Sequence, residues 1–236
     1  MKSKAELIVA LDVDTLSEAK KLVNELSPVV QVFKIGSHLF TAYGPDMVHH
    51  VMSKKRKVFL DLKFHDIPNT VAGAVRSVVG LGKNKNDGVL MCTIHTLGGE
   101  EMLKQAAKAA KEESKRLSKI KPLILGITVL TSESRGDDTA GMVMKRAALA
   151  KRCGLDGIVA SCKEAKMIRK EFGKNFVIVT PGIRPVGADA GDQKRVATPA
   201  DAVLSGSNYL VVGRPIIKAN DPLKAAKEIL KEIASS

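Results

Sequence analysis

The sequence contains no tryptophan and few aromatic residues of any kind. Phenylalanine, tyrosine and tryptophan together make up 3% of its 236 residues. Proteins that bind single-stranded nucleic acids stack the bases on aromatic side chains, and such platforms are largely missing here. We therefore interpret the net charge of +13 as mostly solvated surface and expect no nucleic-acid partner, although a positive field would concentrate a small anion near a binding site.

Cysteine is also scarce. The chain has three, Cys92, Cys153 and Cys162, and no two of them form a C-x-x-C pair. A small, odd number of cysteines fits a reducing cytosol and argues against a structural zinc site. We expect all three to be core or near-core thiols.

Long hydrophobic runs are missing near the N-terminus. Basic residues precede an apolar run at residues 7–11, but Asp12 ends that run. A signal peptide needs an apolar region of about 7–15 residues, and a membrane-spanning helix needs about 20. We therefore expect a cytoplasmic protein with no membrane partner.

Strand-like apolar runs alternate with helix-periodic stretches along the whole chain. The expected strands cover residues 7–12, 30–36, 58–64, 89–94, 122–130, 157–161, 176–180 and 209–212. The expected helices cover residues 17–26, 38–53, 69–79, 99–117, 142–153, 163–172, 198–205 and 222–233. About eight such units in 236 residues predict one α/β domain over residues 1–236, a (β/α)₈ barrel, with a doubly wound open sheet as the alternative.

The segment at residues 57–70 reads K-V-F-L-D-L-K-F-H-D-I-P-N-T. Successive side chains of a strand point to opposite faces, so Asp61, Lys63 and His65 would share one face. Charges are unusual on a buried parallel strand, because an isolated buried charge must be paired or neutralised. Asp61 and Lys63 can offset each other, and Asp66 follows at the turn. We interpret this face as functional; the alternative is an edge strand that carries a solvated ion pair.

In barrels of this type the active site lies at the C-terminal ends of the strands. Polar residues stand at nearly every expected end: Asp12, Lys34, Asp61 with Lys63, His95, Thr131 with Ser132, Ser161, Arg184 and Arg214. The charged residues of the first three strands would converge on one mouth of the barrel.

Two corners of similar composition follow the last two strands, T-P-G-I-R-P at residues 180–185 and V-V-G-R-P-I at residues 211–216. Glycine lets a ligand approach the backbone, and the arginine fork matches phosphate oxygens. Many barrels hold a phosphate at the loops after strands seven and eight. We expect Arg184 and Arg214 to share one phosphate, with Gln193 folding over it; the alternative is that the glycines only turn the chain and the arginines are solvated.

Together these segments resemble the orotidine 5′-monophosphate decarboxylase family, in particular its short, single-domain prokaryotic members. The resemblance covers nearly the whole chain. It rests on A-L-D at 10–12, F-K-I-G at 33–36, D-L-K-F-H-D-I-P-N-T at 61–70, L-T-S at 130–132, P-G-I-R-P at 181–185, D-Q-K-R at 192–195 and V-G-R-P-I at 212–216.

The resemblance implies a cofactor-free carboxy-lyase that converts orotidine 5′-monophosphate (OMP) into uridine 5′-monophosphate (UMP) and carbon dioxide, the last step of de novo UMP synthesis. It implies an alternating network of Lys34, Asp61, Lys63 and Asp66, in which Lys63 donates a proton to C6 of the pyrimidine. It also implies a homodimer in which Asp66 and Thr70 reach the neighbouring site.

The remaining implied contacts are with the substrate. The resemblance assigns ribose hydroxyls to Asp12 and Lys34, the pyrimidine to Thr131 and Ser132, and the phosphate to Arg184, Gln193, Gly213 and Arg214.

Two other functions remain open at this point. A Mg²⁺-dependent sugar-phosphate decarboxylase or lyase could share the barrel, but lysines stand where a metal would supply positive charge and no cluster of three carboxylates is evident, so we expect no metal and activity that survives EDTA. A basic RNA-binding protein without catalysis would instead bind RNA with a steep salt dependence.

Overall fold

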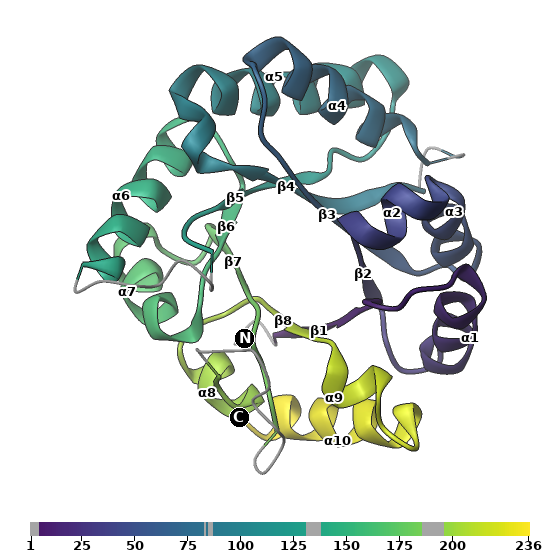
Figure 1. Ribbon diagram of the computed structural model, residues 1–236. Coiled ribbons are helices and arrows are strands. Elements are labelled where there is room, and N and C mark those ends of the chain that lie inside the picture. The colour runs from purple at the N-terminus through teal and green to yellow at the C-terminus, as the bar shows by residue number, and fades with distance from the viewer. Residues whose placement is uncertain (1–4, 83, 85–86, 131–137, 186–195) are drawn as a thin grey trace.

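The computed structural model describes residues 5–82, 84, 87–130, 138–185 and 196–236. Within these ranges, eight parallel strands hydrogen-bond in sequence order, and the last pairs with the first to close a barrel (Figure 1). Helices surround the barrel on the outside (Figure 1). The predicted (β/α)₈ barrel is confirmed, and the open sheet, in which two edge strands would stay unpaired, is wrong.

The eight strands match the predicted runs closely, and only their ends differ. They are β1 Glu6–Ala10, β2 Val32–Gly36, β3 Lys57–Phe64, β4 Val89–His95, β5 Leu123–Ile127, β6 Gly157–Val159, β7 Val177–Thr180 and β8 Tyr209–Val212. β3 pairs with β2 on one side and β4 on the other, so the alternative that it is an edge strand is wrong.

The helices follow the predicted alternation with two differences. They are α1 Leu16–Leu26, α2 Ser37–Tyr43, α3 Asp46–Ser53, α4 Pro68–Gly80, α5 Gly99–Leu117, α6 Thr139–Arg152, α7 Cys162–Phe172, α8 Pro199–Leu204, α9 Arg214–Ile217 and α10 Pro222–Ser235, with a 3₁₀ turn at Thr96–Gly98. The helix expected over residues 38–53 is two helices, because Gly44 takes a left-handed φ of 56° and Pro45 follows it. The short α9 was not predicted.

The core lies on both faces of the sheet. The inner layer fills the barrel with Ile8, Ala10, Val32, Phe59, Met91, Leu125, Val179 and Val211. The larger outer layer packs the strands against the helices; α4, for example, buries Val71, Val75 and Val78, the face that its spacing predicts. A sheet covered on both faces excludes water from the strands, so charges are stable only where the strands end.

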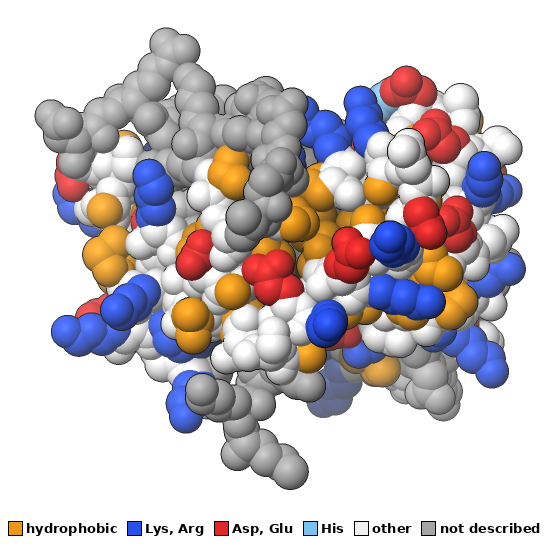
Figure 2. Space-filling view, turned by 90° about the horizontal axis from the view of Figure 1, so that it is seen from below, with side chains coloured by type: hydrophobic (Ala, Val, Ile, Leu, Met, Phe, Trp, Pro, Cys, Tyr) orange, Lys and Arg blue, Asp and Glu red, His pale blue; other side chains and the backbone are white. Residues whose placement is uncertain are grey.

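The few cysteines are buried or partly buried, and charges of both signs are mixed on the surface. Cys92 and Cys153 are buried and Cys162 is partly buried, which confirms the prediction of core or near-core thiols. On the face seen in Figure 2, Lys and Arg side chains are interspersed with Asp and Glu and do not form one continuous patch. None of the helices within the described ranges is long and apolar enough to cross a membrane.

Candidate active site

The candidate site is built from the positions that continue the inner core layer. Side chains of a strand alternate between faces, so the residue two places after an inner core residue also faces the barrel axis, nearer the C-terminal end. These eight positions, one for each strand, hold Asp12, Lys34, Asp61, Thr93, Ile127, Ser161, Pro181 and Gly213. All but Thr93 line a cavity of about 430 Å³ at this end of the barrel. At five of these eight positions the side chain is polar or charged, in contrast to the apolar layer below, and this change marks the floor of the site.

The cavity brings together most of the residues singled out from the sequence. Its lining includes Asp12, Lys34, Asp61, Lys63, Ser161, Arg184, Gly213 and Arg214. Thr131, Ser132 and Gln193 lie outside the described residues. Asp66 and Thr70 are exposed and are not among the described residues that line the cavity.

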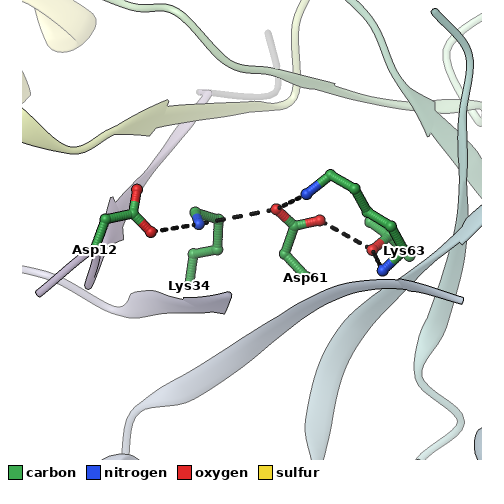
Figure 3. A network of polar contacts seen from close by, with 5 residues as sticks. Asp12, Lys34, Asp61 and Lys63 are labelled. Carbon is green, nitrogen blue, oxygen red and sulfur yellow. Dashed lines mark hydrogen bonds and ion pairs between the residues drawn. The ribbon is translucent and has the colours of Figure 1, made fainter. Parts of the chain in front are cut away.

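Four charged side chains form a chain of alternating sign across the floor (Figure 3). The Lys34 ammonium lies 2.9 Å from Asp12 and 3.8 Å from Asp61, and the Lys63 ammonium lies 2.8 Å from the same Asp61 oxygen, Oδ2. The side chains of Lys34 and Asp61 are each only 12% exposed, so each charge depends on its neighbours for compensation. The Asp61–Lys63 pairing that the strand pattern predicts is confirmed.

The backbone departs from ideal strand geometry at Lys63. The register between β3 and β4 shifts between Leu60 and Phe64, and Lys63 takes a φ of 52°, a conformation that costs a non-glycine residue about 1–3 kcal/mol. The regular alternation of side chains therefore stops at Lys63. His65, which was expected on the same face, instead stacks on His95 with ring centroids 5.4 Å apart and is not among the described residues that line the cavity. In this conformation the Lys63 ammonium reaches Asp61 at 2.8 Å.

Sequence reasoning missed Thr93. Its hydroxyl donates to Asp61 Oδ1 at 2.9 Å and accepts the backbone N–H of Lys63 at 2.9 Å. The sequence interpretation took His95 as the polar end of this strand, whereas alternation from the inner core residue Met91 points to Thr93.

Three more cations, Arg184, Arg214 and Lys218, line the cavity, and we call them the arginine wall. Arg184 is 6% exposed and follows Gly182, whose φ of 76° suits glycine. Arg214 begins α9 directly after Gly213, and Lys218 at the end of α9 also lines the cavity, a contribution that the sequence did not predict.

The lining also includes a buried carboxylate that sequence reasoning missed. Glu164 is 3% exposed and accepts a hydrogen bond from the Ser161 hydroxyl. The described lining then holds five Lys and Arg against three Asp and Glu, an excess of two positive charges. An anionic ligand would offset that excess.

The described residues contain no group of three or more His, Cys, Asp or Glu side chains placed to hold a metal ion. The positive charges in the cavity come from lysine and arginine. The arrangement can hold an anion at its arginine wall and place an ammonium, already paired with a carboxylate, beside the rest of the ligand.

Known proteins resemble this chain over nearly its whole length. Residues 5–229 match the model of the family described as orotidine 5′-phosphate decarboxylase / HUMPS. The chain is 48% identical to the orotidine 5′-phosphate decarboxylase of Moorella thermoacetica, with 99% of this chain and 94% of that protein covered. It is 46% identical to the same enzyme of Coxiella burnetii, with 98% of each covered.

A solved structure is similar to this chain in both fold and sequence. The crystal structure of orotidine 5′-phosphate decarboxylase from Lactobacillus acidophilus superposes with a TM-score of 0.80 at 34% identity, and the match covers 97% of this chain and 99% of that one. The chain therefore agrees with these proteins in both sequence and fold over almost its full length.

Proposed function

Because the chain belongs to the orotidine 5′-phosphate decarboxylase / HUMPS family, we propose that it is a carboxy-lyase that converts OMP into UMP and carbon dioxide without a cofactor. The observation that carries this proposal is the Asp61–Lys63 ion pair at 2.8 Å in the same cavity as Arg184 and Arg214. OMP carries a phosphate at one end and a carboxylate at the other, so its site needs cations that bind the phosphate and a fixed ammonium beside the carboxylate.

The phosphate end of the substrate lies against the arginine wall. Arg184 and Arg214 supply planar forks, and Gly213 leaves the backbone open to the phosphate oxygens. Gln193, outside the described residues, adds a contact from the loop between β7 and α8. Binding energy from this non-reacting group is available to hold the reacting carbon in place.

The ribose and the pyrimidine occupy the floor. Asp12 and Lys34, joined at 2.9 Å, hold the ribose hydroxyls. Thr131 and Ser132, which also lie outside the described residues, contact the pyrimidine. In this proposed binding mode, C6 and its carboxylate lie next to Asp61 and Lys63.

Breaking the bond between C6 and the carboxylate leaves an electron pair on C6 that the ring delocalises poorly. An ammonium about 4 Å from that charge is worth about 4 kcal/mol at an effective dielectric constant near 20. The Lys63 ammonium stabilises the electron pair and then donates a proton to C6, so that a C–H bond replaces the lost C–C bond and the neutral amine regains its proton from water. No electron acceptor is needed.

Asp61 acts on the ground state and on Lys63. Its carboxylate repels the substrate carboxylate. As the bond breaks, that carboxylate becomes neutral carbon dioxide and the negative charge moves to C6, so the repulsion is relieved. At the same time its Oδ2 holds the Lys63 ammonium at 2.8 Å. Fixed partners of this kind need no reorganisation when the new charge develops.

We also propose that the active form is a homodimer in which Asp66 and Thr70 enter the partner's site. Both residues are exposed in the single chain, and so is Ile67 between them, at 66%, which leaves this segment free to contact a partner. Asp66 would then extend the alternating chain of Asp12, Lys34, Asp61 and Lys63 by a fifth member beside Lys63.

Subunit mixing tests the shared site. Lys63→Ala and Asp66→Ala homodimers should each be inactive, but hybrids contain one site with both native residues, so random exchange of subunits should restore about one quarter of the wild-type activity. If Asp66 acts within its own chain, mixing restores nothing. A monomer in sedimentation at assay concentration would also exclude this arrangement.

A Mg²⁺-dependent sugar-phosphate decarboxylase or lyase is the second candidate, because the arginine wall suits any phosphate ester. Lys34 and Lys63, however, occupy the part of the cavity where a metal would stand. The test is to add the protein to OMP in EDTA and follow the ultraviolet absorbance and carbon dioxide release. Equimolar UMP and carbon dioxide support the proposal; no reaction, or one that requires added Mg²⁺, rejects it.

A further inference from the structure

A single buried hydroxyl connects both members of the catalytic ion pair. Thr93 on β4 is 0% exposed. Its Oγ1 lies 2.9 Å from Asp61 Oδ1 and 2.9 Å from the backbone nitrogen of Lys63. Because the amide N–H can only donate and the ionised carboxylate can only accept, the hydroxyl accepts from Lys63 and donates to Asp61.

The position of Thr93 coincides with the break in sheet register. Leu60 pairs with Cys92 and Phe64 pairs with Ile94, so one residue of β4, Thr93, faces the three residues of β3 between those pairs. An insertion of this kind leaves backbone groups without their ladder partners. The Thr93 hydroxyl supplies the acceptor for the Lys63 amide where a neighbouring strand carbonyl would otherwise stand.

The two oxygens of Asp61 therefore have separate tasks. Oδ1 accepts from Thr93, while Oδ2 faces Lys63 at 2.8 Å and Lys34 at 3.8 Å. Without the first bond, the carboxylate can rotate about χ2, since its terminal torsion is broad. The Lys63 backbone, held at a φ of 52°, would lose a restraint at the same time.

We propose that Thr93 is a positioning residue for the decarboxylation, holding both the Asp61 carboxylate and the Lys63 backbone in the geometry that the reaction needs. This inference rests on the proposed function. Thr93 does not line the cavity among the described residues, so it acts through its two partners and not on the substrate. Electrostatic stabilisation depends on such preorganisation, and a misplacement of about 1 Å can cost about a hundredfold in rate.

Three substitutions at one site separate the hydroxyl from the volume of the side chain. Thr93→Val keeps the shape and removes the hydroxyl. Thr93→Ser and Thr93→Ala both lose the methyl group, and only serine keeps the hydroxyl, so their difference isolates the hydrogen bonds even if valine does not fold. We expect kcat to fall by about a hundredfold in Thr93→Val and Thr93→Ala, and by less than about tenfold in Thr93→Ser.

Binding should be spared, because Thr93 is not among the described residues that line the cavity. KM for OMP and Kd for UMP should stay within about threefold of wild type in all three variants. A matched control is Thr180→Val, because Thr180 is also 0% exposed on a barrel strand but its hydroxyl pairs with Ser207 at 2.6 Å, outside the charge network. Thr180→Val should lose stability without the loss of kcat.

The outcomes are distinct. An inactive wild-type protein rejects the proposed function itself. With an active wild type, equal kcat in Thr93→Ser and Thr93→Ala, a kcat in Thr93→Val within about threefold of wild type, or an equal loss in Thr180→Val rejects the role of Thr93 alone. A hydroxyl-dependent loss of kcat at unchanged KM supports it.

Discussion

The arginine wall gives a prediction whose size can be worked out from the residues that line the cavity. Replacing Arg214 by alanine removes a guanidinium from a cavity in which Arg184 and Lys218 remain. Two hydrogen bonds from a charged donor are worth about 3–6 kcal/mol, and the remaining cations compensate in part, so we expect a loss of about 3–4 kcal/mol. At 1.4 kcal/mol per factor of ten, kcat/KM for OMP should fall by about 10²- to 10³-fold.

The assay pairs this substitution with a truncated substrate. Orotidine lacks the phosphate, so it should react slowly with the wild type and at the same rate with Arg214→Ala, because the lost partner is already absent. A control is Arg152→Ala, since Arg152 is 63% exposed and pairs with Glu100 outside the cavity. If Arg214→Ala slows orotidine as much as OMP, or leaves OMP unaffected, Arg214 does not bind the phosphate.

Three further predictions concern the scaffold. Gly157→Ala should lower the melting temperature sharply in a thermal scan, because the added Cβ would lie 2.1 Å from the backbone oxygen of Val177; an unchanged melting temperature would contradict this packing. Burial raises the pKa of the Cys92 thiol to about 12. Mass mapping of alkylated protein at pH 8 should therefore find Cys92 modified only after unfolding and the partly buried Cys162 modified earlier. The reverse order would be inconsistent with the fold. Burial, together with two nearby lysines, lowers the pKa of His50 below 6.5. The unfolded chain therefore takes up this proton at a higher pH than the folded chain, and the free energy of unfolding should fall as the pH drops through 6.5. His50→Leu should flatten that pH dependence in denaturant titrations, and an unchanged dependence would exclude a contribution from His50.

The barrel was predictable because its signals are local and repeated. Apolar runs of strand length alternate with helix-periodic stretches, and a charged face on β3 contradicts a purely structural strand, so Asp61 and Lys63 stood out in the sequence. Helix boundaries depended on single residues. The expected helix over residues 38–53 failed because the conformation of Gly44, not hydrophobic periodicity, decides where α2 ends.

Thr93 was not predictable in the same way. A buried threonine in a strand is common, and its role arises only from the shifted register that brings it opposite residues 61–63. That shift depends on the pairing of two strands and leaves no local signal. Lys218 and Glu164 were missed for a related reason, since helices α9 and α7 bring them to the cavity from outside the strand ends. The role proposed for Asp66 and Thr70 needs a second chain, which no single-chain pattern describes.

The central claim is that the ammonium held by Asp61 carries the chemistry, and Lys63→Ala tests it most directly. Loss of charge stabilisation costs about 10³-fold and loss of the proton donor about 10²- to 10⁴-fold, so single-turnover decarboxylation of OMP should fall by about 10⁵-fold or more. UMP should still bind, measured by calorimetry, because the arginine wall is intact. A Lys63→Ala protein that decarboxylates OMP within about tenfold of the wild-type rate would contradict the account.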